Sequence, residues 1–389
     1  MAPPLRRRLT QIQRRLTQIM FLSSVICHLS SVCYAQSQQY VRVQVMQGLD
    51  SLSLKAEGNY TINGVLKDEV LAKGRDLKTT VTTYRGGILI AGKSFPADKL
   101  FIRTRDPDNV VINGRTFRGD LLLVKEGDKI SAVNYLELED YVKGISIREI
   151  SHYWPPEAIK ASVIVFRTFV LYKAEEGAGR DFDLTSDIYS QVYSGQNAER
   201  YRINKAVDET KGEVIFYKSK VLPAFYHATC AGHTEDAEVL WNIDLAPLKG
   251  VVCPFCKDSP HFRWHLVLTL DEIKEKLAQG GYKIPEIKDI AILGHNPSGR
   301  ITDLKIVSGK KELKIPAKDF RNIIGPNLIK STNFSVTLIN HDVVFEGFGW
   351  GHGVGLCQWG AYFMAKQGHD YKDILKYYYP GSDVKNIGF

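Results

Sequence analysis

The 389-residue chain is 44% hydrophobic and 11% aromatic, which is typical of a folded globular protein and argues against disorder. Its net charge of +8 falls to +3 once the five arginines of residues 1–35 are set aside, and no dense run of Lys and Arg follows. Such a mild charge argues against a nucleic-acid partner.

Residues 1–35 have the three-part pattern of an export signal. A basic start is followed by the apolar run IMFLSSVICHLSSV and by Ala35, a small residue at a plausible cleavage point. The run is short for a membrane span, so an uncleaved N-terminal anchor is the second reading. A lipid on Cys33 is less favoured, because Val32 precedes it where a smaller residue is expected. We therefore predict an exported protein of the periplasm or cell envelope.

Residues 40–133 predict a β-rich part of the fold. Runs such as YVRVQVM, LSLKA, GGILIAG, NVVING and DLLLVKEGDKISAVNYL alternate or are rich in β-branched residues. Gly, Asn and Asp lie between these runs, where turns are expected.

Two helices are predicted next. The first covers 138–150 and carries Glu149 on its apolar face, and Pro155 is expected to end it. The second begins at Pro156, where the missing N–H costs nothing, and ends before Gly177. The apolar stripe of the second helix consists of Ile159, Val163, Phe166 and Val170.

The rest of the chain predicts loops and short strands over 181–265, then a short helix, several strands, the Gly-rich loop GFGWGHGVGLCQWGA and a last helix. We find no low-complexity linker. The predicted fold class is therefore α+β: a β-rich body with a central two-helix segment, continuous over 40–389. Within it we distinguish the β-rich part, a helical and Cys/His-rich part (134–265) and a C-terminal β part (266–389).

Glu149 offers acid–base chemistry. A carboxyl group on the buried side of a helix loses solvation, which favours its protonated form. Such a group can protonate a leaving oxygen and later take a proton back, as in the cleavage of glycosidic bonds. The second reading is an ordinary buried ion pair with Arg148, Arg167 or Lys160.

Other acids near this segment have a simpler interpretation. Glu157, the main rival, falls in the first turn of a helix, where the dipole favours a carboxylate. Glu137 and Glu139 fall where the first helix begins. We interpret all three as structural.

Cysteine and histidine spacing predicts a metal site. Cys230-x-x-His233 and Cys253-x-x-Cys256 are two chelating pairs, and together they predict a structural zinc with all four positions filled. His227 is the alternative fourth ligand, or else a residue of the cleft. In an exported chain a disulfide, Cys253–Cys256 or Cys230–Cys256, is the competing interpretation.

The Gly-rich loop predicts a sugar-binding segment. Its glycines let the backbone approach a ligand closely. Trp350 and Trp359 suit stacking on sugar rings, and His352 and Gln358 suit hydrogen bonds to hydroxyls. Cys357 near His352 also fits the Cys–His pair of a peptidase, although a small buried packing residue is the simpler interpretation.

The segment NYLELEDYVKGISIREISHYWPPEAIKASVIVFRTFVLY resembles the signature of the SpoIID family, the stage II sporulation protein D group that includes amidase enhancers. INGRTFRGDLLL (112–123), SQVYSGQNAE (190–199) and GWGHGVGLCQWGAYFMAKQGHDYKDILKYYYPG are similar to further family segments. The resemblance extends from Tyr40 to Phe389. The family's catalytic acid stands before a methionine, and that acid falls on Glu149, with Ile150 in place of the methionine.

The resemblance implies a lytic transglycosylase. Such enzymes cut the β-1,4 bond between N-acetylmuramic acid and N-acetylglucosamine of peptidoglycan glycan strands, and leave a 1,6-anhydro ring with one carboxyl as acid and base. It also places Arg167, Gln191, Tyr193 and His227 near the signature segments, and we predict that they bind substrate. A cell-wall amidase is a further candidate partner. Some family members bind zinc near the Gln-Val-Tyr segment, but TSDIYSQVYSG contains neither Cys nor His.

Two other functions stay open at this point. The first is a non-catalytic peptidoglycan-binding protein that stimulates an amidase. The second is a cell-wall peptidase that depends on Cys357.

Overall fold

The computed structural model describes residues 40–388 apart from 67, 105–109, 178 and 187–190. The predicted export signal, residues 1–35, lies outside the described residues. Among the helices of the described part, none combines the length and the apolar character that crossing a bilayer requires.

The chain forms two compact units. The described part of the first contains residues 40–153, 166–223 and 383–388, and the second contains 154–165 and 224–382. The units do not follow the order of the chain, unlike the three consecutive parts expected from the sequence.

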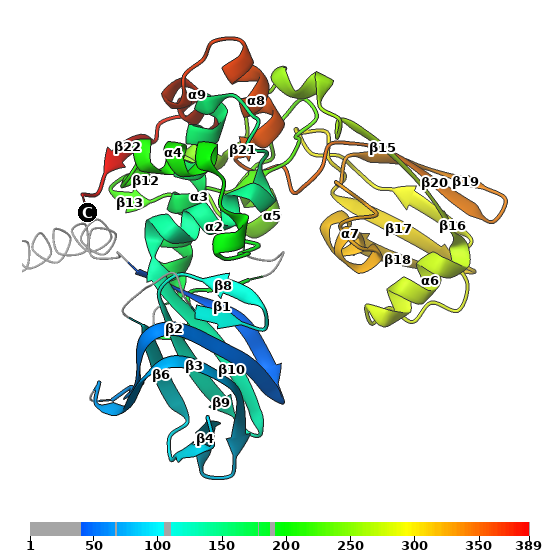
Figure 1. The fold of residues 1–389 in the computed structure, drawn as a ribbon. Helices are drawn as coiled ribbons and strands as arrows, with labels where there is room; N and C mark the ends of the chain where they lie inside the picture. The colour runs from blue at the N-terminus through cyan, green and yellow to red at the C-terminus, as the bar shows by residue number, and fades with distance from the viewer. Residues whose placement is uncertain (1–39, 67, 105–109, 178, 187–190, 389) are drawn as a thin grey trace, which may run out of the picture. The chain divides into compact units, whose positions relative to one another are not determined.

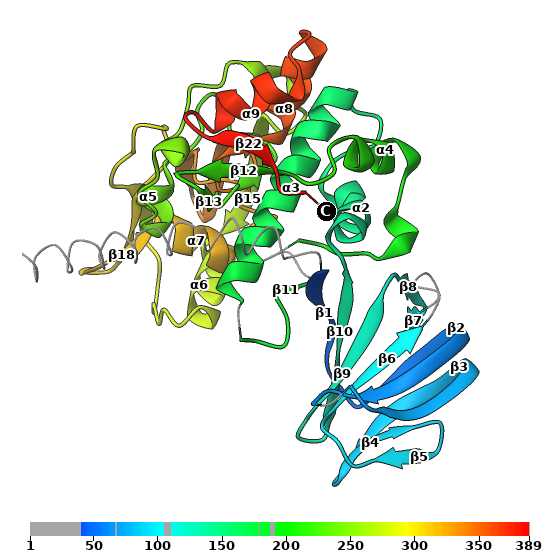
Figure 2. The ribbon, with the colours of Figure 1, turned by 90° about the vertical axis from the view of Figure 1, so that its left-hand side faces the viewer.

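The first unit is built on a large sheet with the order β11-β1-β10-β9-β6-β2-β3-β4-β5, in which β7 joins β2 to β8 (Figures 1 and 2). β1 and β11 are parallel and the other neighbours are antiparallel. The strands are β1 (Tyr40–Leu49), β2 (Ser51–Gly64), β3 (Val70–Tyr84), β4 (Gly87–Ile90), β5 (Lys93–Phe95), β6 (Lys99–Thr104), β7 (Val110–Ile112), β8 (Arg115–Phe117), β9 (Asp120–Glu126), β10 (Lys129–Glu137) and β11 (Leu184–Thr185).

Local sequence explains this sheet. Asn113 and Gly114 both have positive φ, 48° and 80°, and form the two-residue turn between β7 and β8, which favours these residue types. The apolar run in β9 is covered on both faces: Leu121 and Leu123 are buried on one side, and Leu122 packs in a small cluster on the other. The predicted β-rich part is therefore confirmed.

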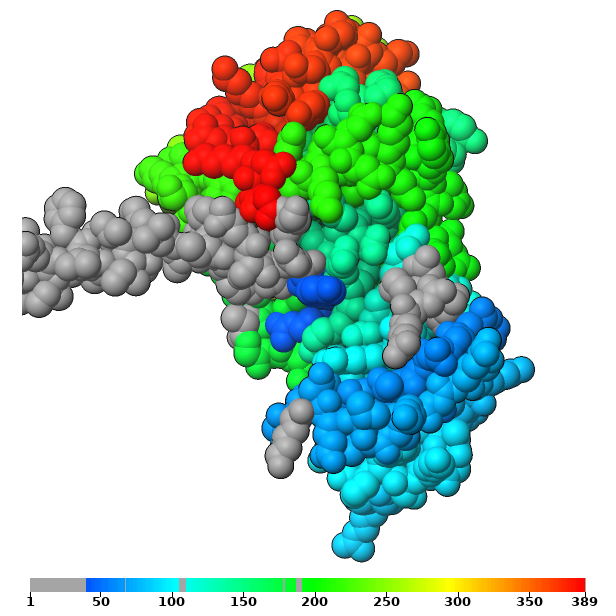
Figure 3. Space-filling model, turned by 60° about the vertical axis from the view of Figure 1, so that its left-hand side comes forward, coloured from blue at the N-terminus to red at the C-terminus, as the bar shows by residue number. Residues whose placement is uncertain are grey.

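Helices and a small sheet complete the first unit. The helices are α2 (Leu138–Glu149), α3 (Pro156–Glu176), which also enters the second unit, η1 (Gln196–Ala198) and α4 (Tyr201–Glu209). The sheet has the order β13-β12-β22, with β12 (Glu213–Tyr217), β13 (Lys220–Val221) and β22 (Asp383–Asn386). In Figure 3 the red C-terminal strand β22 lies against a green segment, in agreement with its antiparallel pairing to β12.

Both predicted helices are confirmed, with two differences. α2 ends at Glu149, several residues before Pro155. α3 is buried along its whole central part, residues 161–171, and not on one stripe alone. A helix that is apolar on all sides is a core helix, so the single stripe was too narrow a prediction.

The second unit contains short sheets and helices. Its sheets have the orders β15-β20-β19, β16-β17-β18 and β14-β21. The elements are β14 (Tyr226–His227), α5 (Ala237–Trp241), η2 (Ala246–Leu248), η3 (Phe255–Asp258), β15 (Arg263–Thr269), α6 (Leu270–Gln279), β16 (Asp289–Ile292), β17 (Asp303–Ser308), β18 (Lys311–Pro316), α7 (Ala317–Ile324), β19 (Phe334–Ile339), β20 (Asp342–Phe348), β21 (Leu356–Cys357), α8 (Gln358–Lys366) and α9 (Tyr371–Tyr378).

One hydrophobic cluster holds the part from β15 to β20, with Phe320 and Phe345 at its centre. α6 begins with a capping box in which Thr269 and Glu272 each bind the other's backbone N–H. Together the units confirm the predicted α+β, β-rich fold class.

Candidate functional site

Glu149 is the last residue of α2. Its side chain is half-buried, whereas Val142 and Ile145 on the same face are fully buried. The carboxyl therefore stands where an apolar face meets the end of a helix, as the periodicity predicted.

A buried tyrosine, Tyr141, lies beside this acid. Its hydroxyl donates to Oε1 of Gln191 at 2.9 Å, and both side chains are almost fully buried. Burial raises the pKa of Tyr141 well above its ordinary value, and the negative charge of Glu149 adds to the shift. The sequence analysis did not select Tyr141, although it lies eight residues before Glu149, in the stretch LEDY of the segment that resembles the family signature.

Tyr193 is a packing residue of this site. It is buried, its hydroxyl donates to Oδ1 of Asn134 at 3.1 Å, and its ring lies 5.3 Å from that of Tyr141. A Cβ at Gly144 would stand 2.4 Å from the Tyr193 ring. Gln191 and Tyr193 thus support α2 from the side, and direct contact of either with substrate stays a prediction.

We expect Gly144→Ala to destabilise the protein by up to about 2 kcal/mol. The methyl group overlaps a fully packed ring, a cost of about 1–3 kcal/mol, while alanine recovers about 1 kcal/mol of helix propensity. Urea unfolding measures the difference. Gly64→Ala is the control, because its added Cβ would meet its nearest neighbour at 3.9 Å. Equal stability of the two variants would contradict the close contact at Gly144.

Arg167 requires a correction. It was expected to contact substrate, but its side chain is fully buried and donates to both carboxylate oxygens of Glu139, at 2.7–3.2 Å. Further bonds reach the carbonyl oxygens of Val207 and Glu213. Because Glu139 accepts the hydrogen bonds of the Arg167 guanidinium, this pair holds α3 to α2.

Two of the other acids, Glu139 and Glu157, have structural partners, as interpreted. Glu157 forms an ion pair with Lys160 at 3.1 Å and accepts a hydrogen bond from the backbone N–H of Tyr371. It therefore joins the first turn of α3 to the start of α9.

Four cysteines meet in the second unit: Cys230, Cys253, Cys256 and Cys357. All four are buried free thiols, and their Sγ atoms lie within 4.8 Å of one another. The group can hold a metal ion. It does not contain a disulfide, so this competing interpretation does not describe the structure.

His233 requires the second correction. The fourth member of the group is Cys357 from the Gly-rich loop, and His233 is not part of it. Nδ1 of His233 instead donates to the carbonyl oxygen of Thr234 at 2.6 Å. The spacing Cys-x-x-His suggested a chelate, but the true partner is 127 residues from Cys230 in sequence.

Hydrogen bonds converge on the sulfur atoms. Sγ of Cys357 accepts from the backbone N–H of Cys230 and of Gly360, both at 3.3 Å. The hydroxyl of Tyr378 lies 3.1 Å from Sγ of Cys253. Donors aimed at sulfur stabilise a thiolate and so fit a metal-bound state.

Burial adds a reason for a cation at this group. It raises the pKa of the Cys357 thiol well above its ordinary value, and the neighbouring cysteines raise it further. Four thiolates cannot share a dry space unless a positive charge compensates them. The residues present therefore fit a metal bound by four sulfurs.

His227 and His352 are two histidines whose pKa values lie below the ordinary value. His227 is buried, and Nδ1 donates to the carbonyl oxygen of Val354 at 3.1 Å. Burial lowers the pKa of His227 well below its ordinary value and that of His352 to about 3. Nδ1 of His352 accepts from the N–H of Val354, and the two rings are 5.7 Å apart. Gln358, the first residue of α8, is buried as well.

These observations remove the peptidase reading of Cys357. A Cys–His catalytic pair needs an exposed thiolate and an imidazole that can be protonated. Cys357 is fully buried among the other cysteines, and the low pKa of His352 keeps its ring neutral.

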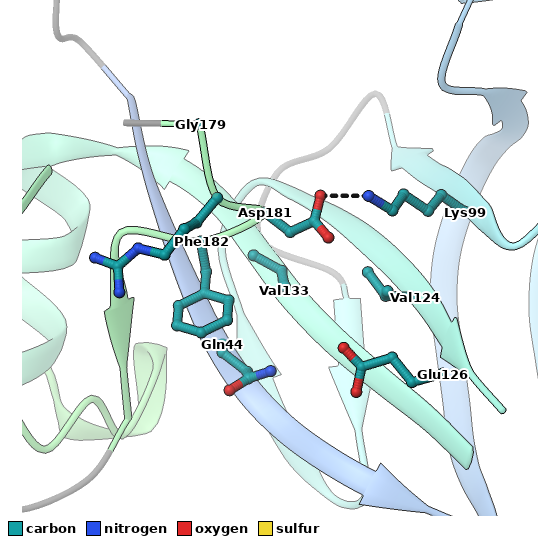
Figure 4. A pocket seen from close by; sticks show the side chains of 9 residues that line it. Gln44, Lys99, Val124, Glu126, Val133, Gly179, Asp181 and Phe182 are labelled. Carbon is teal, nitrogen blue, oxygen red and sulfur yellow. Dashed lines mark hydrogen bonds and ion pairs between the residues drawn. The ribbon is translucent and has the colours of Figure 1, made fainter. Parts of the chain in front are cut away.

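A cavity of about 320 Å³ lies beside the large sheet of the first unit. Lys99 and Asp181 form an ion pair across it at 2.6 Å, and Phe182 lies near Gln44 (Figure 4). Its described lining includes none of the predicted site residues, and we assign no chemistry to it.

Comparison with known proteins finds two family models that match parts of the chain. The family model "Stage II sporulation protein" (SpoIID) matches residues 126–217, and a domain of unknown function (DUF8618) matches 255–355. The first match contains Glu149, Tyr141 and Gln191.

Three relatives extend the comparison. An uncharacterized protein of Brachyspira hyodysenteriae is 32% identical over 358 residues, which cover 92% of this chain and 95% of that protein. The stage II sporulation protein D of Bacillus subtilis is 29% identical over 269 residues, 65% of this chain and 76% of that protein. The amidase enhancer of Bacillus subtilis is 26% identical over 291 residues, 62% of this chain and 40% of that protein. The chain therefore belongs to the SpoIID family.

Proposed function

We propose that the protein is an exported lytic transglycosylase of the cell envelope that cuts peptidoglycan glycan strands, with Glu149 as its acid and base. One observation carries the proposal. Within the matched family segment, Glu149 is a half-buried carboxyl at the end of α2, beside the buried Tyr141–Gln191 pair.

The geometry suits a single-carboxyl mechanism. Partial burial and the negative end of the helix dipole both favour the neutral form of Glu149. The neutral carboxyl donates its proton to the leaving glycosidic oxygen as the bond to C1 breaks. The resulting carboxylate takes the proton of the C6 hydroxyl, and O6 bonds to C1 to close the 1,6-anhydro ring. Neither a second carboxylate nor a water is needed.

Neighbouring acids are engaged elsewhere, which supports a single catalytic carboxyl. Glu139 is bound by Arg167, and Glu199 is bound by Arg118 at 2.7 Å.

The proposed transglycosylase activity is tested by digestion of purified glycan strands, followed by mass spectrometry for 1,6-anhydro ends. Their absence from wild-type digests would refute the proposal.

A second candidate function is stimulation of a cell-wall amidase without catalysis. The match to a protein named amidase enhancer favours it. Strand binding without any cleavage product, together with faster peptide release by an added amidase, would select this function.

We also propose that the metal at the four cysteines is zinc. Tetrahedral sites of four sulfurs are typical of zinc or iron–sulfur centres, and a filled coordination shell indicates a structural role. Sγ of Cys230 and of Cys256 are 3.5 Å apart. A zinc–sulfur bond of about 2.3 Å gives a tetrahedral edge of roughly 3.8 Å, which is close to this spacing.

We expect metal analysis of the mature protein to find about one zinc per chain. Cys357→Ser should lower this content strongly and reduce the melting temperature, because it removes one of four ligands. His233→Ala is the matched control and should retain the metal. Loss of zinc from the His233 variant, with retention in the Cys357 variant, would contradict the ligand set.

A further inference from the structure

Two arginines of the first unit reach the same short segment from different elements. Arg115, in β8, donates through Nη2 to the carbonyl oxygen of Tyr193 at 3.3 Å. Arg148, in the last turn of α2, donates through Nε to Oγ of Ser194 at 2.9 Å. Since Tyr193 and Ser194 are consecutive, two guanidinium groups gather at one place.

Neither arginine has a carboxylate partner within 4.0 Å in the part of the chain that the structure describes. Two acids of the same unit are bound by another arginine: Arg118 pairs with Glu199 at 2.7 Å and approaches Asp140 at 3.9 Å. Nε of Arg115 is buried and makes no hydrogen bond to any described residue, while its guanidinium lies 5.0 Å from the centre of the Phe117 ring. Among the described residues, this N–H donor therefore has no acceptor.

Electrostatics makes the pair receptive to an anion. Burial lowers the pKa of Arg115, and the positive charge of Arg148 lowers it further. Two like charges at one site repel each other, and a bound anion removes the repulsion and supplies an acceptor for buried N–H groups. Arginine suits a carboxylate in particular, because two parallel N–H groups of its planar guanidinium match the two carboxylate oxygens.

We propose that Arg115 and Arg148 form a subsite for a carboxylate of the peptidoglycan strand. The inference rests on the proposed function. In a glycan strand, the acidic groups belong to the muramic acid residue: its lactyl carboxyl when no peptide is attached, or the carboxyls of the stem peptide. Because Arg148 directly precedes Glu149 in α2, binding this group helps to place the scissile bond against the acid.

The experiment compares three substrates: strands freed of peptide, the same strands with the lactyl carboxyl converted to a methylamide, and peptide-bearing strands. If the lactyl group is bound, wild type has the lowest KM on the free strands. Arg148→Gln should raise that KM about ten- to a hundredfold, the range of one charge-assisted hydrogen bond. The KM for methylamide strands should change much less, because these strands lack the charged group. If the stem peptide is bound, the same loss should appear with peptide-bearing strands.

Two further variants serve as a test of the guanidinium geometry and as a control. Arg115→Lys keeps a charge but loses the planar guanidinium, so its KM should also rise on the preferred strand. Arg85→Gln, an exposed arginine of the same unit, is the control and should behave as wild type. Equal ratios of KM across the three substrates in wild type and Arg148→Gln would overturn the subsite.

Binding measurements separate this inference from the proposed reaction. Fluorescence titration of the Glu149→Gln variant with each strand reports affinity without cleavage. Preference for a carboxylate-bearing strand, with no anhydro ends in wild-type digests, would keep the subsite and reject the transglycosylase. Anhydro ends without such a preference would reject the subsite alone.

Discussion

Glu149→Gln is expected to lower the rate of 1,6-anhydro product formation by about 10²- to 10⁴-fold, the contribution of one general acid–base group. Glutamine keeps the shape of the side chain but has no proton to give to the leaving oxygen. The measurement is the initial rate of anhydro-end formation by mass spectrometry. Strand binding should be nearly unchanged, because the substitution affects the transition state and not the ground state.

The control for this variant is Glu157→Gln, which alters an acid engaged by Lys160 and Tyr371. It should lose some stability and retain the reaction. Undiminished ring closure by Glu149→Gln, or equal loss of activity in both variants, would show that the catalytic acid is another residue.

Arg167→Met is expected to destabilise the protein by about 3–5 kcal/mol, because it leaves the buried carboxylate of Glu139 without its partner. The backbone N–H of Gly212 also donates to Glu139, at 3.0 Å, but one neutral donor does not replace a guanidinium. Chemical unfolding measures the loss.

The double variant Arg167→Met/Glu139→Leu tests the cause. Replacing both members of a buried pair by apolar residues is often nearly neutral, so much of the stability should return. No recovery in the double variant would mean that Arg167 acts mainly through its bonds to the carbonyl oxygens of Val207 and Glu213.

Much of the fold could be predicted from periodicity. The two central helices, α6 and the strands from β17 to β20 have clear apolar spacing and turn residues, and all were expected. β3 was missed, although it has 15 residues, because its side chains are largely exposed and it contains Gly74, Asp76 and two lysines. Pairing with β2 on one side and β4 on the other decides its conformation, and pairing is not visible in one segment.

The surroundings of a candidate residue could be predicted where they depend on its own helix, and were missed where they depend on residues far away in the sequence. Glu149 could be located because helix periodicity and motif agree. Cys357 could not be joined to Cys230, since the contact depends on the pairing of β14 with β21 and on the start of α8. Arg167 was misjudged for a related reason: its partner, Glu139, lies on another helix.

The pairing of β12 with β22 has a consequence for biosynthesis. The first unit contains β22, Asp383–Asn386, so the ribosome must synthesise the chain beyond Asn386 before this unit can close. Removal of residues 383–386 is therefore expected to disturb the half of the protein that is synthesised first.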